Sequence, residues 1–334
     1  MLDLNIWTLT TISKCSWDDA TGKWTIDLAR TRDGKMDIRT IFPKHVVQAT
    51  GHNGEPYFTP DIKGIDSFPS ARLMHSSKFK GALPSHSQNK KAIVVGSCIS
   101  GHDIAKNFFD NVYSATMVQH SSTLVLTVES HATLLEAFFN EAILSTELAD
   151  TIFLSSPNIL LKRYMTVNTA IQNNLDKKLL DGLIKAGFKL DRGIDGSGFW
   201  MKHIQRGGGY YIDSGCSQLI VDGKIKVKQG QEISEILPQG IKFTDGEIIQ
   251  ADEIVFATGY LSMRAQCRKI FGDKVADHVK DVWGMDEEDE IRGLCRNSGH
   301  PGFWFMAGNL FLVDGTPKCS LCRSRRVRRA YTEP

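Results

Sequence analysis

No stretch of this 334-residue chain is apolar over the roughly 18 positions that a membrane-spanning helix requires. The N-terminal sequence MLDLNIWTLTTI has neither a basic start nor a small-residue cleavage site, so we expect no signal peptide. The seven cysteines are odd in number and irregularly spaced, which argues against a disulfide framework. These absences predict a protein without a membrane span, located in the reducing cytoplasm.

Charge of one sign is also lacking, because the formal net charge is only +2. We therefore predict no nucleic-acid partner, although Arg323–Arg329 is a local basic run. Cys319 and Cys322 have no second pair at metal-binding spacing, so we predict no metal site. The length fits one large domain or two ordinary ones.

The stretch Lys90–Ala105, KKAIVVGSCISGHDIA, combines an apolar strand, a glycine turn and a helix-compatible segment. This order forms the phosphate-binding corner of dinucleotide folds, where the turn is tight and the helix N-terminus faces a pyrophosphate. Gly96 and Gly101 fit the pattern, whereas Cys98 stands where the motif has its second glycine. An ordinary strand–turn–helix of an α/β domain is the alternative interpretation.

Ala115–Gln119 is predicted as the next strand, which completes a βαβ unit. The residue after this strand often contacts the adenosine ribose, where an acid favours NAD. Here His120 and Ser121 follow, with no carboxylate, so NAD is disfavoured. Hydroxyls and a possible imidazolium could hold a 2′-phosphate. The alternative is a solvated loop histidine.

The tripeptide Ala-Thr-Gly follows an apolar strand twice, with Thr50–Gly51 in the first copy and Thr258–Gly259 in the second. A third strand end carries Gly308–Asn309. Glycine at such a point lets the backbone pass a ligand or turn sharply.

Other parts of the chain are predicted from hydrophobic periodicity. The segments Leu4–Ser13, Lys23–Arg30 and Arg39–Ala49, the last with a break at Pro43, alternate as strands of an antiparallel β-meander. Asp61–Pro84 is predicted as a connector, His131–Asp150 and Lys162–Ala186 as helices, and Arg192–Asp213 as a glycine-rich loop. In the second helix, Leu175, Leu179 and Leu183 form a stripe expected to face the core.

Several long motifs resemble those of fungal flavin-containing monooxygenases, which are related to the YUCCA-type plant enzymes. They are GSCISGHDIA, the two Ala-Thr-Gly strand ends, KLLDGLIKAGFKLD, DGSGFWMKHIQRGGGYYIDSGCSQLIVDGKIKV and PGFWFMAGNL. The resemblance implies an α/β fold with a Rossmann-like NADP domain inserted into an FAD-binding domain. It further implies that NADPH reduces FAD, and that reduced flavin takes up O2 to give a C4a-(hydro)peroxide that oxygenates a small organic substrate.

The resemblance also implies roles for particular residues. The turn of Gly96, Ser97, Cys98, Ile99, Ser100 and Gly101 would cradle the NADPH pyrophosphate, with His120 and Ser121 near the 2′-phosphate. Thr50, Gly51, Gly308 and Asn309 would line the FAD side, and Thr258 and Gly259 are the further cofactor-binding candidates. The family's Phe-x-Gly-x3-His pattern appears here with Phe68 and His75, without its glycine and one residue longer. No catalytic residue is assigned, and the oligomeric state is not predicted.

The predicted domains follow from the same resemblance. Residues 1–60 would be the remnant of an FAD-binding domain built as a β-meander, 61–250 the NADPH-binding domain with a helical insertion, and 251–312 the return to the FAD-binding domain. We predict N-terminal truncation, because the family's Gly-x-Gly-x-x-Gly turn for FAD precedes the point matching Leu2. Permitted codons of the last residues can also spell a family-like helix and a stop in another frame, so we expect 313–334 to be an out-of-frame or disordered tail.

Three functions therefore remain open. The first is a flavin-dependent monooxygenase, with activity in doubt for this chain. The second is a non-catalytic NADP-binding remnant or a fragmentary gene product. The third, an NADP-dependent reductase without flavin, lacks a Tyr-x-x-x-Lys-type proton donor pair.

Overall fold

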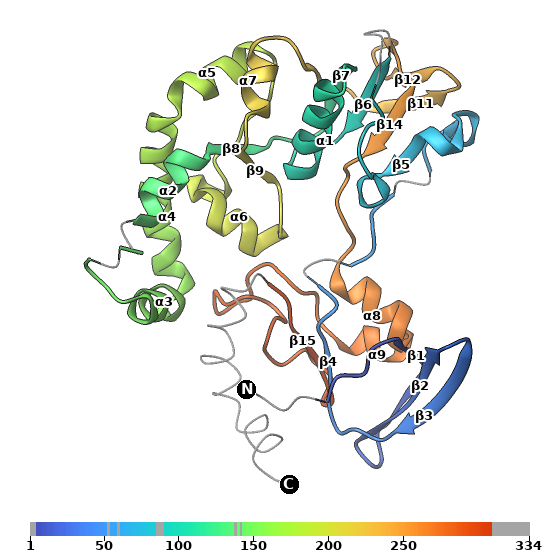
Figure 1. The fold of residues 1–334 in the computed structure, drawn as a ribbon. Coiled ribbons are helices and arrows are strands. Elements are labelled where there is room, and N and C mark those ends of the chain that lie inside the picture. The colour runs from blue at the N-terminus through green and yellow to red at the C-terminus, as the bar shows by residue number, and fades with distance from the viewer. Residues whose placement is uncertain are drawn as a thin grey trace. The chain divides into compact units, whose positions relative to one another are not determined.

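The structure, a computed structural model, describes residues 5–51, 54–58, 61–84, 90–136, 139–140 and 142–308. The predictions for Asn309 and for the tail 313–334 therefore lie outside the described residues. The chain divides into two compact units (Figure 1). Unit 1 comprises Met1–Glu55 and Leu261–Pro334, and unit 2 comprises Pro56–Tyr260. The domain boundaries placed at 60/61 and 250/251 stay predictions.

A five-stranded parallel sheet forms the centre of unit 2. Its order is β10 (Lys226–Gln229), β7 (Ser114–Gln119), β6 (Lys91–Val95), β14 (Glu253–Phe256) and β5 (Leu73–His75). The central strand β6 is an uninterrupted apolar run buried on both faces, as parallel strands usually are. Strand β5 lies inside the segment that we predicted as a connector, so that prediction is wrong.

Two different layers cover this sheet. On one face, Val94 packs with Phe108 of α1 (Ile99–Asp110), and with residues of α5 (Lys177–Lys185) and α7 (Cys216–Val221). On the other face, Ile93 packs with Phe243 of a small antiparallel sheet, formed by β11 (Ile233–Leu237), β12 (Gly240–Phe243) and β13 (Ile248–Gln250). The strict alternation of strand side chains sends Ile93 and Val94 to opposite layers.

The remainder of unit 2 is mostly helical. It consists of β8 (Leu124–Thr127), α2 (Val128–Glu136), α3 (Thr146–Ser155), α4 (Asn158–Leu175), α6 (Gly198–Arg206) and β9 (Tyr210–Asp213), which pairs in parallel with β8. Short 3-10 turns occur at η1 (Ile65–Ser67), η2 (Ser70–Arg72), η3 (Ser76–Lys78) and η4 (Ile194–Gly196).

The predictions of two helices and of one loop need correction. Neither predicted helix is continuous: the first gives way to α2 and α3, and the second breaks at Asp176 between α4 and α5. The carboxylate of Asp176 accepts hydrogen bonds from Thr127 and Ser130, which draws the chain away from a straight helix. The break changes the helical phase, so Leu183 is buried while Leu175 is exposed. The glycine-rich loop contains a helix, α6, that the pattern did not predict.

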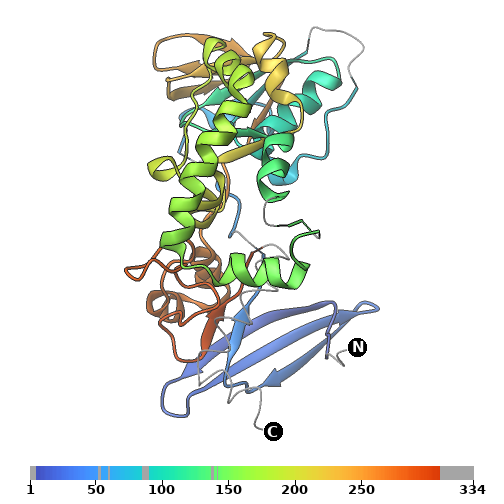
Figure 2. The same cartoon turned by 90° about the vertical axis from the view of Figure 1, so that its left-hand side faces the viewer.

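Unit 1 contains the predicted meander, with β1 (Thr10–Asp18), β2 (Lys23–Arg32) and β3 (Lys35–Ile41) side by side (blue in Figure 2). The first strand begins at Thr10, whereas the predicted strand began at Leu4, which lies outside the described residues. The third predicted strand is broken near Pro43, because proline has no N–H for a ladder. Its second piece, β4 (Val46–Gln48), pairs in parallel with β15 (Phe303–Phe305), beside α8 (Met263–Phe271) and α9 (Asp273–His278).

The core of unit 1 is aromatic. Trp24 is fully buried and its indole Nε1 donates to the Gly302 carbonyl over 2.8 Å. Phe271, His300 and Phe303 pack around it. The ring cluster therefore joins the meander to the last described strand.

Candidate functional site

In the parallel sheet of unit 2, the order in which strands are added reverses at β6, which lies between β7 and β14 (Figure 1). From β6 the chain passes through α1 to β7 on one side, whereas β14 lies on the other side. Ligands of open α/β sheets bind at such a switch point, beyond the carboxyl ends of the strands. Here these ends carry Gly96 after β6 and Ala257–Gly259 after β14.

Both glycines of the predicted turn are sterically required. Gly96 has φ +123°, and a Cβ there would lie 2.3 Å from the Ala257 carbonyl oxygen. A Cβ on Gly101 would lie 2.1 Å from the Gly96 carbonyl oxygen. Both contacts are with backbone carbonyl oxygens, which cannot move aside as a flexible side chain would. Helix α1 therefore approaches the turn closely only because both positions lack side chains.

Cys98 does not disturb this arrangement. Its backbone is extended, with φ −94° and ψ −164°, which any residue adopts. The thiol is directed toward Thr123, with Lys202 nearby, and burial raises the pKa of this thiol. Cys98 is the N-cap of α1 but its side chain makes no capping bond, so the first N–H groups of the helix are left for an anion. The side chains of Ile99 and Ser100, in the first helical turn, are exposed.

The loop after β7 is held against the turn by contacts that the sequence pattern did not predict. Ser97 and Thr123 hydroxyls lie 2.8 Å apart in a buried position. Ser122 donates to the Asp191 carboxylate over 3.0 Å, and the largely buried Lys202 ammonium pairs with the same carboxylate. These bonds fix the position of the following strand end relative to the glycine turn.

His120 lies at the surface beyond β7, as does Ser121. The ring Nε2 of His120 is 3.0 Å from a carboxylate oxygen of Glu232, which comes from the loop after β10. No carboxylate follows His120 directly in the sequence. Glu232 is more than a hundred residues further along the chain, so the sequence pattern could not predict this contact. The acid weakens the attraction of this corner for a 2′-phosphate.

A histidine that the motif did not single out lies beneath the turn. His102 is completely buried and its ring stacks on Tyr211, with centroids 3.8 Å apart. Its Nδ1 is 3.1 Å from the Cys98 carbonyl oxygen, and its Nε2 has no hydrogen-bond partner within the described structure. Burial lowers the pKa of His102 to about 4, so the ring is neutral at physiological pH.

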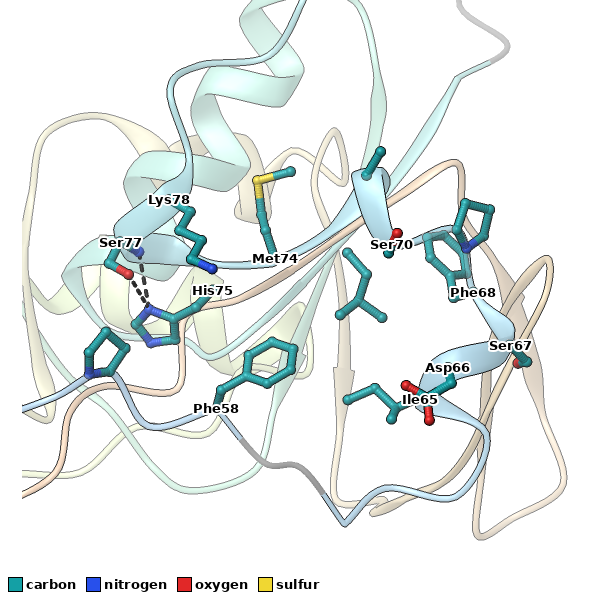
Figure 3. A pocket seen from close by; sticks show the side chains of 14 residues that line it. Phe58, Ile65, Asp66, Ser67, Phe68, Ser70, Met74, His75, Ser77 and Lys78 are labelled. Carbon is teal, nitrogen blue, oxygen red and sulfur yellow. Dashed lines mark hydrogen bonds between the residues drawn. The ribbon is translucent and has the colours of Figure 1, made fainter.

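His75, the histidine of the family pattern, is tied to the second Ala-Thr-Gly strand end. Its Nε2 is 2.9 Å from the Gly259 carbonyl oxygen, and its Nδ1 accepts from the Ser77 N–H over 3.1 Å (Figure 3). Thr258 donates to the Tyr57 carbonyl over 2.5 Å. Burial lowers the pKa of His75. With both ring nitrogens engaged, His75 positions the Thr258–Gly259 loop rather than transferring protons.

An open pocket of about 1080 Å³ adjoins His75. Figure 3 shows Phe58, Ile65 and Met74 around it, with Asp66 and Lys78 as the charged residues of its lining. Phe68 of the family pattern is buried in the core between the parallel sheet and the β11–β13 sheet, and it also lines this pocket. The pocket is therefore mostly apolar, and both residues of the pattern, Phe68 and His75, belong to its lining.

The predicted FAD-side residues lie in unit 1, at the ends of the parallel pair β4 and β15. The Thr50 hydroxyl is 3.0 Å from Gln266 Oε1, and Gly51 has φ +107° with open space around it. Gly308 has φ +131°. The buried Gln48 Oε1 has no hydrogen-bond partner among the described residues. Within the described part of unit 1, neither strand is followed by a helix whose N-terminus could face a pyrophosphate.

The structure thus brings the predicted residues together in two groups. Unit 2 gathers Gly96–Gly101 with Thr258 and Gly259, and places His120 and Ser121 beyond the neighbouring strand. Unit 1 gathers Thr50, Gly51 and Gly308. Across the described ranges, no group of three or more His, Cys, Asp or Glu residues could hold a metal ion. No helix in those ranges is long and apolar enough to span a membrane.

A parallel sheet with a close glycine turn and an uncapped helix N-terminus at its switch point defines an α/β protein of the dinucleotide-binding type. Residues 5–265 match the family described as flavin-binding monooxygenase-like, and the chain belongs to this family. The mixed α/β fold that the sequence predicts is confirmed.

Curated relatives come from plants. The probable indole-3-pyruvate monooxygenase YUCCA4 of Arabidopsis thaliana is 30% identical over 253 residues, covering 75% of this chain and 53% of the relative. The indole-3-pyruvate monooxygenase YUCCA1 of Oryza sativa subsp. japonica is 29% identical, covering 79% of this chain and 56% of the relative. The chain thus spans about half the length of the curated relatives it matches.

Solved structures share the fold at low identity. A cyclohexanone-bound cyclohexanone monooxygenase superposes with a TM-score of 0.55 and 15% identity, covering 92% of this chain and 64% of that structure. An ε-caprolactone-bound structure of cyclohexanone monooxygenase gives 0.54 and 12%, covering 92% and 65%. These matches support the fold assignment.

Proposed function

We propose that this chain binds NADP(H) at the β6–α1 turn and serves a flavin-dependent monooxygenase reaction. One observation carries the proposal: Gly96 and Gly101 leave room where a Cβ would collide with backbone, and they flank a helix N-terminus without a side-chain cap, Gly96 before it and Gly101 in the first helical turn. An anionic pyrophosphate is the ligand that such a corner binds best. Membership of the flavin-binding monooxygenase-like family supports the choice of NADP(H) as this ligand.

The residues present fit the dinucleotide. Backbone N–H groups of Cys98–Gly101 would hold the pyrophosphate, and the Thr258–Gly259 loop borders the same crevice. His120 and Ser121 would lie on the ribose side, opposed by the carboxylate of Glu232. When bound, NADPH supplies a hydride and FAD carries the electrons to O2. The chain's own residues bind and orient these groups, and none is assigned as acid, base or nucleophile.

The fit to FAD is weaker within the described residues. Thr50, Gly51 and Gly308 offer two strand ends and permissive backbone, but no glycine turn leads into a helix there. No complete Gly-x-Gly-x-x-Gly occurs in the 334 residues, and in the Gly96–Gly101 turn Cys98 replaces one glycine. We therefore propose FAD, O2 and a small organic substrate as partners of the full reaction on family grounds, and NADP(H) on the geometry of unit 2. Assignment to the fungal branch and a cytoplasmic location remain predictions.

A non-catalytic NADP-binding protein is the second candidate. The same observation supports it, because the glycine turn of unit 2 continues into a helix without a side-chain cap, while no such turn is found in the described part of unit 1. Such a protein would bind the dinucleotide without oxidising it.

Oxidation of NADPH by the purified chain, followed with and without added FAD, separates the candidates. For the enzyme we expect FAD-dependent oxidation that Gly101→Val abolishes, because valine collides with the Gly96 carbonyl. Binding of NADP+ without any FAD-dependent oxidation would favour the second candidate. Absence of NADP+ binding to a folded chain would contradict both.

A further inference from the structure

Helix α4 has polar residues on its buried face and a row of apolar residues on its exposed face, the reverse of most surface helices. Its buried face contains Asn168, Thr169 and Gln172. On its outer face, Leu160, Val167, Ile171 and Leu175 are 54%, 61%, 46% and 55% exposed. We call these four residues the α4 stripe. Surface helices normally bury the apolar face, so an exposed stripe of this length marks a contact surface.

The rotation of α4 about its axis is fixed by contacts on the buried side. A Cβ on Gly198 would lie 2.0 Å from the Thr169 hydroxyl, so this side of α4 lies tightly against the start of α6. Lys162 reaches the Asp195 carboxylate at 2.6 Å, which holds the first turns in the same orientation. Leu161 is buried on this side too. The stripe therefore cannot turn inward without loss of these contacts.

The apolar positions on this face of α4 are close to symmetric about the Val167–Asn168 peptide. Reversing the helix direction about this peptide places Leu160 of one copy opposite Leu175 of another and Ile171 opposite Tyr164, which is 37% exposed, and it brings both Val167 residues close to the axis. Two-fold dimers require such self-complementary surfaces, in which each residue finds its counterpart on the other copy. The stripe is about 22 Å long, at about 1.5 Å per residue.

Charge favours the same arrangement. Between Asn158 and Leu175 the helix carries Lys162 and Arg163 near its N-terminus and no acidic residue. A parallel pair would place four cations side by side. An antiparallel pair separates them and brings each toward the partner's last helical turn, where the backbone dipole is negative. From these observations we propose that the α4 stripe is a homodimer interface, docked antiparallel on the same stripe of a second copy of this chain.

The exposed area sets the strength of this dimer. Four half-exposed aliphatic side chains give a patch of a few hundred Å², comparable with the largest patch of a typical monomer. One helix pair buries less than the roughly 1,600 Å² of a standard interface, so the dimer is weak and forms with rising protein concentration.

Sedimentation velocity of the purified 334-residue chain over a micromolar concentration series tests the interface. We expect a monomer–dimer equilibrium, and Val167→Asp weakens it by about tenfold or more because the charge occurs twice near the axis. Met36→Asp is the matched control, since Met36 is similarly exposed on β3 of unit 1 and should leave association unchanged. A wild-type chain that stays monomeric throughout the series overturns the proposal, as does equal disruption by both substitutions.

Cross-linking gives an independent test that does not depend on a destabilising charge. In Val167→Cys, two copies of the new thiol meet at the symmetry axis, so mild oxidation yields a disulfide-linked dimer. Ile248→Cys, on the exposed strand β13, should cross-link no faster than the unmodified chain. Equal cross-linking at both positions contradicts the proposal.

A membrane surface is the competing partner, because an apolar stripe beside two cations also suits anionic lipid. Flotation with phosphatidylcholine–phosphatidylserine vesicles distinguishes the two. We expect no binding of the wild-type chain. Vesicle binding that Val167→Asp removes, from a chain that remains monomeric, would replace the dimer with a membrane contact.

Discussion

Two pairs of adjacent parallel strands end in glycine-containing turns, one pair in each unit, and the two turns differ in their surroundings. In unit 2, Gly96 meets the Ala257 carbonyl, and Gly101 lies in the first turn of α1 against the Gly96 carbonyl. In unit 1, Gly51 has a similar positive φ but open space around it. A permissive backbone is thus common to both turns. In unit 1 the close approach belongs to Gly54, where a Cβ would lie 2.3 Å from the Ser262 carbonyl oxygen at the side-chain-capped start of α8, whereas the turn of unit 2 continues into α1, whose N-terminus has no side-chain cap. The comparison indicates that the surroundings of a glycine, rather than the glycine itself, define a phosphate-binding corner.

Alanine substitutions at Gly96 and at Gly51 should give the largest difference in stability between the two turns. Gly96→Ala combines an unfavourable φ with a backbone collision, so we expect unit 2 to lose about 3 kcal/mol of unfolding free energy. Gly51→Ala has the φ penalty without the collision and should cost about 1 kcal/mol. Urea denaturation of both variants measures the difference. Equal losses would show that the close approach at Gly96 has no energetic consequence.

Valine at Gly101 tests whether the corner binds the cofactor. The side chain would force α1 away from the Gly96 carbonyl, so we expect the NADP+ Kd to rise on the order of 100-fold, or about 2.7 kcal/mol. Ser100→Ala is the matched control, because it keeps the backbone N–H and alters an exposed side chain. Calorimetric titration with NADP+ gives both values. Unchanged affinity in a folded Gly101→Val would move the cofactor away from this turn.

The stability of unit 2 should fall in mild acid because of His102. The pKa of this ring drops from its ordinary 6.5 to about 4 on burial, so the unfolded chain takes up a proton that the folded chain refuses. The folded chain therefore has its full stability above pH 6.5, the pKa of His102 in the unfolded chain. It loses stability as the pH falls from there toward about 4, the pKa of His102 in the folded chain. Between about pH 7.5 and pH 5 the expected loss is about 2 kcal/mol.

His102→Phe is the control for this pH dependence, since it retains an aromatic ring against Tyr211 but cannot titrate. We expect its urea-unfolding free energy to vary with pH by about 2 kcal/mol less than that of the wild type over the same interval. Identical pH profiles would mean that His102 is not buried in its neutral form.

The smallest predicted effect concerns the edge of the cofactor corner. Glu232→Gln removes the carboxylate that lies 3.0 Å from His120 Nε2. Because both side chains are mostly exposed, we expect NADP+ to bind up to about 5-fold more tightly, with little change for NAD+. Competition titrations with the two dinucleotides measure the ratio. Equal gains for both would indicate a general charge effect rather than contact with the 2′-phosphate.

The sequence predicted much of this architecture because local patterns determine it. The strand β6, the turn at Gly96–Gly101 and the meander follow from apolar alternation and glycine placement. Side-chain contacts across the fold were not predictable in this way. The break at Asp176 depends on hydroxyls of Thr127 and Ser130 some fifty residues earlier.

The sequence predicted the strand, turn and helix of the candidate site, but not the side-chain contacts that hold them in place. Cys98 seemed an obstacle because a motif does not reveal where a side chain points, and the structure directs its thiol toward Thr123. The pairing of His120 with Glu232 and the bond from His75 to Gly259 join segments far apart in sequence. A single sequence contains no signal for these contacts, since they arise from the paths of loops.

Calorimetric titration of the unmodified chain with NADP+ and, separately, with FAD tests the central claim most directly. We expect saturable binding of NADP+ at one site per chain and markedly weaker binding of FAD, because a close glycine turn that continues into a helix without a side-chain cap is found in unit 2 and not in the described part of unit 1. Tight FAD binding without measurable NADP+ binding would contradict it.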